Sequence, residues 1–522
     1  MEQEGKKLQG ELFSRGFSTD LAAEFVLPDY QPEIKRLLRV RAIALPVDQY
    51  IGAAGAELSG AVEFQALYAA GDDSLWCVTK REDYQLSCPI EATDEFDLSD
   101  APVCEIQTET EGVSGRVLAP RKLSARCRVR TQVCLLSDRA KTALSPESAE
   151  GIEPLTDQIW ASRVRIGKSA PFTLTDEILL DPSKPPLRVI SASGEVFPTE
   201  VKAGTDLVAC RGDLLLTLLC AEEQIPSLEN AEDCLPASAL PVLLSRRIPF
   251  AVEVPLDGVQ PSCACNAWGS CSEVAVTVEE SRILCDLTAV LTVRAVCREE
   301  FSFVRDAFST VRLTEPVFRV LPVQKNLCCR NANCSVSATK ELASFGLKPD
   351  SRILETTADV LLQTPEAARG NYILPGVVTF HILALSPDGD VSTCDLEAPF
   401  RFETPAETAA VPAKNASVAL PVLAKSTLDS SRLLAEAELS LALDLSAADS
   451  VELLSDLRSG EPLAPRPQTD LRIYYPSPSD SLWSVAALYH TPVTSLLKKN
   501  HLPTPTSLSS PDSLNGVRYL VV

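Results

Sequence analysis

Alternating apolar and polar positions recur in three stretches of the chain that share one frame. Each frame begins at an arginine followed by two apolar residues and ends 24 residues later at a glycine. The arginines are Arg36, Arg188 and Arg352, and the glycines are Gly60, Gly212 and Gly376. The offsets between copies, 152 and 164, are the same at both ends of the frame. The frame is therefore an internal repeat, and three copies of one domain are predicted to fill most of the chain.

The alternation around each glycine predicts short β-strands with one buried face. In the first copy the expected strands are 37–44, 61–68, 84–89, 104–110 and 125–134. In the later copies the clearest runs are 274–278, 282–296 and 431–445. The run 431–445 is rich in Ala, Leu and Glu, which favour helix by propensity, but its repeat partners predict a strand. No long amphipathic helix separates these runs, so we predict a mainly β fold of three tandem antiparallel β-sandwich-like domains.

The repeat also sets the expected domain boundaries. Repeat domains are predicted at 21–167, 168–326 and 327–455, with the strands 158–166 and 316–323 reaching into the following copy. Residues 1–20 are polar with little periodicity and are interpreted as a flexible lead-in. Residues 456–470 are rich in Pro and charge, which predicts a linker. Tyr84 and Phe400 follow their glycines by 24 residues and Phe250 by 38, because of an acidic insertion around 221–240.

A different pattern begins at Leu471 and predicts a small βααβ domain over 471–522. A strand at 472–475 is followed by a helix at 481–489, with Asp480 expected as its N-cap. Thr491 is expected to cap a second helix with Pro492 at its first position, and Asn500 to end it. The run 516–521 is the expected closing strand.

Charge narrows the classes of partner. The chain carries a formal net charge of −23, which repels phosphate backbones and argues against nucleic-acid binding. Residues 471–522 carry +2, which leaves −25 for the rest and supports a separate C-terminal module. No transmembrane run or secretion signal is visible, so a cytosolic protein is expected. The 17 cysteines then indicate buried reduced thiols rather than a disulfide framework.

The sequence offers no clear catalytic, cofactor or metal site. The three histidines, His381, His490 and His501, are too dispersed for a triad, and His381 is interpreted as a half-buried structural residue. No nucleotide-binding loop occurs. Two cysteine clusters, Cys263-x-Cys265-x5-Cys271 and Cys328-Cys329-x4-Cys334, lack the paired spacing of a zinc ribbon, so no metal is predicted. Oxidative cross-linking of exposed thiols is an alternative role for them.

The C-terminal module resembles a LysM domain. Asp480-Ser481-Leu482-Trp483, Ala486, Tyr489, Leu497 and Asn500 match that pattern in order. Such modules commonly bind glycans containing N-acetylglucosamine, such as peptidoglycan, through the loops after the first strand and the second helix. The resemblance implies a ligand site at Asp480, Ser481, Leu482, Asn500, His501 and Leu502. Ser479 replaces the usual glycine and the loop 501–515 is unusually long, which leaves open a protein-docking role or a purely structural role for these residues.

With the module placed, the three-copy body resembles tandem SPOCS domains. The segments that carry this resemblance are 27–34, 121–125 and 306–310. The domain order resembles that of spore-coat morphogenetic proteins of endospore-forming Firmicutes, particularly the clostridial type. That family implies a non-enzymatic scaffold, made in the mother-cell cytoplasm, that joins the coat to the developing spore surface. Its implied partner is a coat basement-layer protein, a cytoskeletal ATPase.

Two other classes of protein remain as alternatives. One is a cell-envelope protein that uses the LysM-like module as a peptidoglycan anchor, which would require export. The other is an enzyme such as a cell-wall hydrolase, for which the repeats leave no unique catalytic domain. We therefore expect a scaffold without cofactor.

Overall fold

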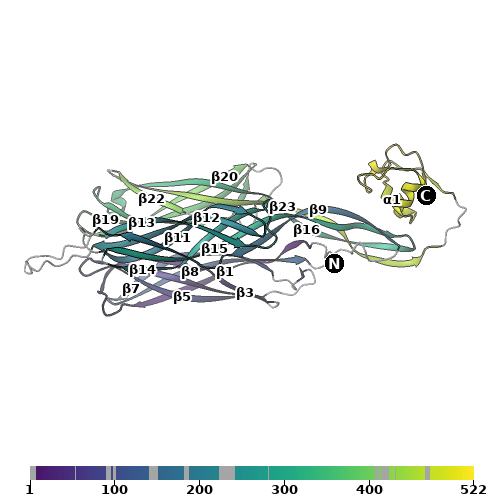
Figure 1. The fold of residues 1–522 in the computed structure, drawn as a ribbon. Coiled ribbons are helices and arrows are strands. Elements are labelled where there is room, and N and C mark those ends of the chain that lie inside the picture. The colour runs from purple at the N-terminus through teal and green to yellow at the C-terminus, as the bar shows by residue number, and fades with distance from the viewer. Residues whose placement is uncertain are drawn as a thin grey trace, which may run out of the picture.

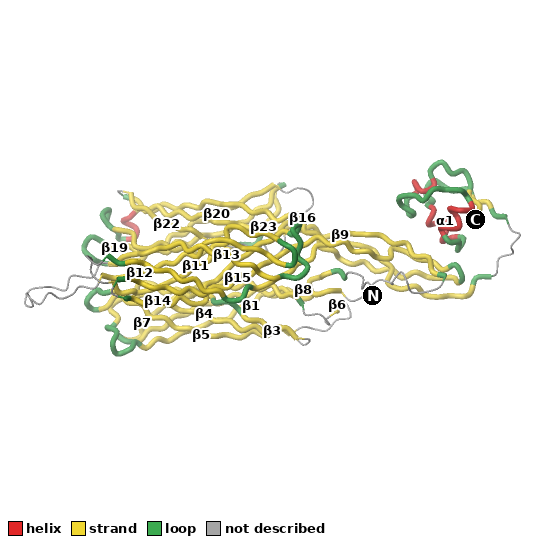
Figure 2. The backbone as a smooth tube through the Cα atoms, viewed as in Figure 1, coloured by secondary structure: helices red, strands yellow, loops and turns green. Residues whose placement is uncertain are grey.

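Strands dominate the computed structural model, and its helices are short (Figures 1 and 2). The structure describes residues 7–52, 55–89, 96–97, 102–139, 151–181, 187–222, 241–279, 281–368, 370–405, 411–412, 422–429, 431–464 and 471–522. Figure 1 shows a broad body of strands, a narrow stalk that leaves one end of it, and a small module at the far end of the stalk. The prediction of a mainly β protein is confirmed.

Three segments of the chain, 7–139, 151–309 and 312–462, each form two antiparallel sheets. The first segment contains β1 (Gln9–Val26), β6 (Phe96–Asp97), β7 (Val103–Ala119) and β8 (Lys122–Arg139) in one sheet, and β2 (Ile34–Ala44), β3 (Asp48–Gly52), β4 (Gly55–Ala70) and β5 (Leu75–Pro89) in the other. The second contains β9 (Ile152–Lys168), β10 (Phe172–Leu179), β14 (Ala264–Val278) and β15 (Arg282–Ser309), and then β11 (Leu187–Ala203), β12 (Leu207–Glu222) and β13 (Pro241–Pro255). The third contains β16 (Arg312–Glu341), β21 (Val411–Pro412), β22 (Val422–Asp429) and β23 (Arg432–Pro462), and then β17 (Arg352–Leu362), β18 (Glu366–Ala368), β19 (Asn371–Leu385) and β20 (Val391–Pro405).

Each segment buries an apolar core between its two sheets, because its strands alternate inward apolar and outward polar residues. In the first segment Phe64 and Tyr68 of β4 lie in one buried cluster with Leu123 of β8. Leu216 of β12 and Leu287 of β15 share the corresponding cluster of the second segment. The third segment has an equivalent cluster, and the short 3-10 helix η1 (Leu342–Phe345) adds Leu342 to it.

The glycine that ends each frame lies directly opposite an aromatic residue of the next strand. The pairs are Gly60 with Tyr84, Gly212 with Phe250, and Gly376 with Phe400. The aromatic ring lies over Gly60 and over Gly376, where an added Cβ would clash with it. Glycine is therefore required by close approach and not by a turn. The insertion before Phe250 leaves this register unchanged, and its residues 223–240 lie outside the described part of the chain.

A β-bulge follows the arginine that begins each frame. It gives the apolar residues after that arginine a structural role. In β2, β11 and β17 the pairing skips the residue two positions after that arginine, and the skipped residues are Leu38, Ile190 and Leu354. These three side chains lie in one apolar cluster with the repeat-related Leu67, Leu219 and Leu383. The bulge thus supplies apolar side chains to a contact shared by all three segments.

Polar contacts cross the same boundaries. Arg36 Nη2 donates to the carbonyl of Val391 at 2.7 Å, and Arg188 Nη2 donates to the carbonyl of Leu75 at 2.9 Å. Arg39 pairs with Glu355 at 2.6 Å, and both side chains are largely buried. The frame residues therefore hold the segments together, in addition to forming strands within them.

Two ribbons of strands extend beyond the body and pack against each other as the stalk, defined here as 152–160, 300–309, 312–322 and 450–462. β9 pairs with the second half of β15, and the first half of β16 pairs with the second half of β23. Phe303 of β15, Leu321 of β16 and Leu453 of β23 are buried between the ribbons. At the tip, β15 turns directly into β16 (Figure 1).

Several expected boundaries differ from the structure. The interpretation of 1–20 as a flexible lead-in is wrong for 9–20, which lie in β1 and pair with β8. Few side chains of β1 are buried, so its own sequence shows little alternation. The predicted linker 456–470 begins too early, because 456–462 belong to β23. Pairing assigns β9 to the second segment and all of β16 to the third, instead of boundaries at 167 and 326. The strand expected at 431–445 is confirmed from Arg432 onward.

Candidate functional site

The C-terminal module, residues 471–522, is held together by a small apolar core. β24 (Ile473–Tyr474) pairs with β25 (Leu520–Val521), and α1 (Leu482–Leu488) and α2 (Val493–Lys499) pack beside them. The 3-10 helix η2 (Pro511–Leu514) closes the loop that precedes β25. Leu482, Ala486, Leu496 and Leu520 are the most buried members of the core. The closing strand is shorter than the predicted 516–521.

Ser481, and not Asp480, is the N-cap of α1. The Ser481 hydroxyl accepts from the Ser484 backbone N–H at 3.1 Å, and the Ser484 hydroxyl lies 2.9 Å from the Ser481 N–H, which forms a capping box. The expected cap, Asp480, instead accepts from the Tyr474 hydroxyl at 2.6 Å and from the Ser477 N–H at 2.7 Å. The hydrogen bond from Tyr474 lowers the pKa of Asp480. Asp480 therefore fastens the loop between β24 and α1.

The start of α2 also differs by one residue from the prediction, whereas its end agrees. Pro492 is the N-cap and makes no side-chain cap, so Thr491 is not the capping residue. Thr491 donates from its hydroxyl to the carbonyl of Tyr489. Asn500 ends the helix as predicted, and its amide joins α2 to β25 through the Val521 carbonyl at 3.0 Å and the Val521 N–H at 2.7 Å.

The six candidate ligand residues lie on two neighbouring loops, but most of them stabilise the module itself. The loops meet through two backbone donors. The backbone N–H of Trp483 donates to the Leu508 carbonyl at 3.1 Å, and the backbone N–H of Leu482 donates to the Ser513 hydroxyl at 2.8 Å. Ser481 and Leu482 are buried, and Asp480 and Asn500 make the bonds described above. His501 is exposed in a left-handed conformation with φ 51°, and Leu502 is half-buried beside it. His501 is the candidate best placed to meet a ligand.

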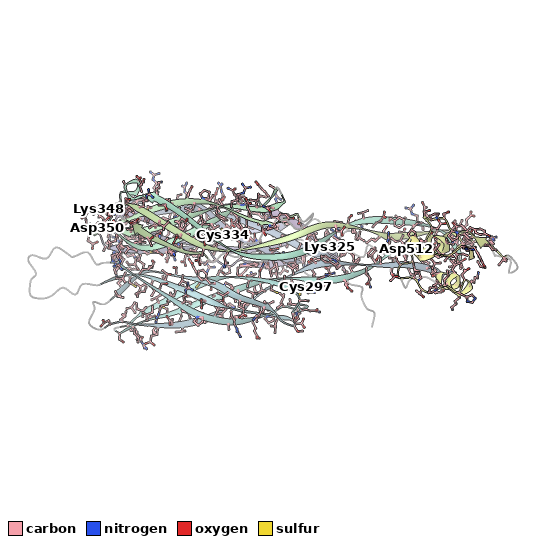
Figure 3. The ribbon with its side chains drawn as sticks, turned by 90° about the horizontal axis from the view of Figure 1, so that it is seen from above. Cys297, Lys325, Cys334, Lys348, Asp350 and Asp512 are labelled. Atoms are coloured by element: carbon pink, nitrogen blue, oxygen red, sulfur yellow. A yellow bond between two sulfur atoms is a disulfide. The ribbon has the colours of Figure 1, made fainter. Side chains whose placement is uncertain are left out.

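The structure places a second contact surface on the module, where it sits on the tip of the stalk. Trp483 Nε1 donates to Asp306 Oδ2 at 2.8 Å, and its ring lies 5.0 Å from that of Phe308 at an angle of 60°. His490 Nδ1 lies 2.8 Å from the carbonyl of Ser309, so this nitrogen must carry the proton. Leu155 of β9 joins the same apolar cluster. Figure 3 shows the module at the end of the stalk.

Sequence reasoning missed this contact because its two halves are far apart in the chain. The segment 306–310 stands out in the sequence, but no local pattern pairs it with the module. The sequence around Trp483 indicates a helix residue that belongs to a small core. Only the tertiary structure shows that Leu155 and Phe308 of the stalk complete that core. We name the surface formed by Leu155, Asp306, Phe308 and Ser309 the seat.

The expectation of reduced cysteines is wrong for one pair. Cys263, from the first cysteine cluster, forms a disulfide with Cys297 of β15, which belongs to neither cluster. The two residues are 34 positions apart and meet only through the pairing of β14 with β15. Burial raises the pKa of Cys265 and of Cys271 to about 11, so both are protonated, weakly reactive thiols at neutral pH.

The remaining cysteines do not assemble into a metal site within the described residues. No group of three or more His, Cys, Asp or Glu side chains there could hold a metal ion. In the second cluster Cys334 is a half-buried free thiol. The side chains of Cys328 and Cys329 lie outside the described part of the structure.

His381 of β19 bridges two carboxylates that belong to the two neighbouring strands. Its Nε2 lies 3.1 Å from Asp359 and its Nδ1 lies 2.7 Å from Asp395, so the three residues link β17, β19 and β20. The hydrogen bonds to Asp359 and then to Asp395 raise the pKa of His381 to about 9. The ring is therefore charged at neutral pH, and the interpretation of His381 as a half-buried structural residue is confirmed.

These features define the class of protein: a mainly β protein of several antiparallel sheets that carries a small helix-containing module on a stalk. None of the described helices is long and apolar enough to span a membrane. No family model, no curated protein and no solved structure matches the chain.

Proposed function

We propose that the protein is a non-enzymatic scaffold of endospore coat assembly. In this proposal the three segments are SPOCS-like repeat domains and the C-terminal module is LysM-like. The protein is made in the mother-cell cytoplasm and acts at the surface of the developing spore. Its partner is a coat basement-layer protein, and the module is the anchoring contact.

The observation that carries the proposal is the separation of two kinds of surface in one extended molecule. The body offers broad sheet surfaces, and the stalk holds the module at the opposite extremity (Figure 1). A molecule of this shape can bind one partner with its body and another with its tip. Linking two such contacts raises the apparent affinity for a layered surface by effective concentration.

The geometry of the module favours a protein partner over a glycan. Of the six candidate ligand residues, Asp480, Ser481, Leu482 and Asn500 are occupied by bonds or packing within the module. Only the short stretch around His501 remains available on the second loop. Peptidoglycan binding by a cell-envelope protein remains the alternative function.

Capture by the immobilised full-length chain tests the proposal. The chain would be exposed separately to purified peptidoglycan and to lysate from sporulating cells, and bound proteins identified by mass spectrometry. We expect retention of a coat basement-layer ATPase, at least fivefold weaker for His501→Asn and absent for a chain that ends at residue 470. Asn accepts the left-handed conformation at this position.

The matched control is Tyr30→Ser, which changes an exposed side chain of the first segment. This variant should capture the ATPase as well as the unchanged chain does. Retention on peptidoglycan that His501→Asn loses, without capture of a coat protein, would instead establish the glycan-anchor alternative.

A further inference from the structure

The contact between the module and the seat is small and is made by few groups. Among the described residues it includes two hydrogen bonds, to Asp306 and to Ser309, the ring contact of Trp483 with Phe308, and the apolar packing of Leu155 in the same cluster. Both rings are only 5% exposed, so each depends on the other for burial. An apolar contact of this kind binds whichever copy of the module reaches it, because the seat contains no feature that distinguishes its own chain.

The connection between the stalk and the module also starts beside the seat. The Leu463 N–H donates to the carbonyl of Val311, next to the turn that carries Ser309. Ten residues then separate Pro462 at the end of β23 from Ile473 at the start of β24. Such a length of chain spans at most roughly 35 Å, which is enough to reach the seat of its own stalk or that of another tip placed against it.

The position of the seat makes a second copy accessible to it. The seat lies at the extremity of the molecule, with the body at the opposite end of the stalk (Figures 1 and 3). Two molecules can therefore meet tip to tip while their bodies stay apart. The charge distribution favours this approach, because residues 471–522 carry +2 and the rest of the chain −25. Side-by-side bodies repel, whereas a module is attracted to the acidic chain of another copy.

We propose that the seat accepts the module of a second copy, so that two molecules join tip to tip by reciprocal exchange of their modules. Every contact of the closed molecule is then remade between chains, and the exchange costs mainly the entropy of association. In dilute solution we expect each module to contact the seat of its own chain. Where the protein is concentrated on a surface, we expect the pair with exchanged modules. This inference goes beyond the proposed scaffold function and does not depend on what the module binds.

Complementation between two full-length variants tests the exchange. The first variant, Asp306→Ala with Phe308→Ala, has a defective seat and an intact module. The second, Trp483→Ala, has an intact seat and a defective module. Neither variant alone can form the contacts of Trp483 with Asp306 and Phe308, but in a mixture the module of the first fits the seat of the second. Light scattering coupled to size-exclusion chromatography would measure the masses.

We expect each variant alone to be monomeric. The mixture should contain at least tenfold more dimers, measured as particles of twice the monomer mass, than either variant alone. Asp306→Ala alone and a chain that ends at residue 464 serve as second versions of the two partners, in case the larger changes disturb the stalk or the module. The effective concentration of a module beside its own seat is about 1 mM. If every mixture contains only monomers at protein concentrations up to that value, the proposal is overturned. Pairs formed equally well by either variant alone would also overturn it, because they would not use the seat.

Discussion

At the residue scale, the bonding partners of a few polar side chains decide what they can do. Asp480 has the residue type expected for a helix cap, yet Ser481 takes that position because its hydroxyl forms a reciprocal bond with Ser484. His381 pairs with Asp359 and Asp395, and these two aspartates keep its ring charged. Each side chain contributes to stability through these partners.

His381 gives a pH dependence whose sign follows from its raised pKa. The pKa is about 6.5 in the unfolded chain and about 9 in the folded one, so the folded state holds the extra proton between these values. The stabilisation is fully present below pH 6.5 and is lost as the pH rises through about 9. We expect His381→Gln to lower the free energy of unfolding by about 1 kcal/mol at pH 6.

Urea unfolding at pH 6 and at pH 9.5 would measure this effect. The difference between the variant and the unchanged protein should shrink at the higher pH, because most of the His381 side chains are then neutral in the folded state as well as in the unfolded one. An equal loss at both values would contradict the role of the two aspartates and point to packing of the ring instead.

At the element scale, the frame glycines allow neighbouring strands to approach closely. Gly212 of β12 lies opposite Pro198 of β11, and an added Cβ would clash with the Phe197 carbonyl and come within 2.8 Å of Pro198 Cα. Backbone atoms cannot move aside as the end of a flexible side chain can. The frame glycine of the second copy therefore cannot be replaced by any larger residue without a backbone clash.

Gly212→Ala should destabilise the protein by about 2 kcal/mol through this overpacking. The matched control is Gly71→Ala, because nothing lies within 4 Å of a Cβ added at that turn. The control should change stability by less than about 0.5 kcal/mol. Thermal or urea unfolding of both variants checks the prediction, and equal effects would disprove the close approach.

At the scale of the whole molecule, buried pairs between segments tie the body into one unit. Arg39 of β2 and Glu355 of β17 come from the first and third segments and are 12% and 7% exposed at their side chains. Removing one partner leaves the other charge buried without compensation. The pair therefore couples the unfolding of segments that are more than 300 residues apart.

Arg39→Ala is expected to cost about 3 kcal/mol, because Glu355 would be left without its ionic partner. The double variant Arg39→Ala with Glu355→Ala should lose less than the sum of the two single changes. Arg81→Ala serves as the control, since Arg81 and Asp83 form an exposed pair. Additive losses in a double-mutant cycle followed by urea unfolding would refute the coupling.

The sequence determined the β class, the repeat and the order of elements in the module, because these depend on local periodicity and on turn and cap residues. The strand at 432–445 shows this, since comparison with its repeat partners outweighed its helical propensity. Strands whose own sequence shows little alternation, such as β1, could not be predicted in this way.

Only the tertiary structure decided which surfaces meet. The disulfide between Cys263 and Cys297, the pair of Arg39 with Glu355 and the placement of Trp483 on Phe308 all join positions distant in the chain. Such contacts depend on how sheets pack and how long ribbons extend beyond them. A one-dimensional pattern specifies which face of a strand is apolar, but not which other face covers it.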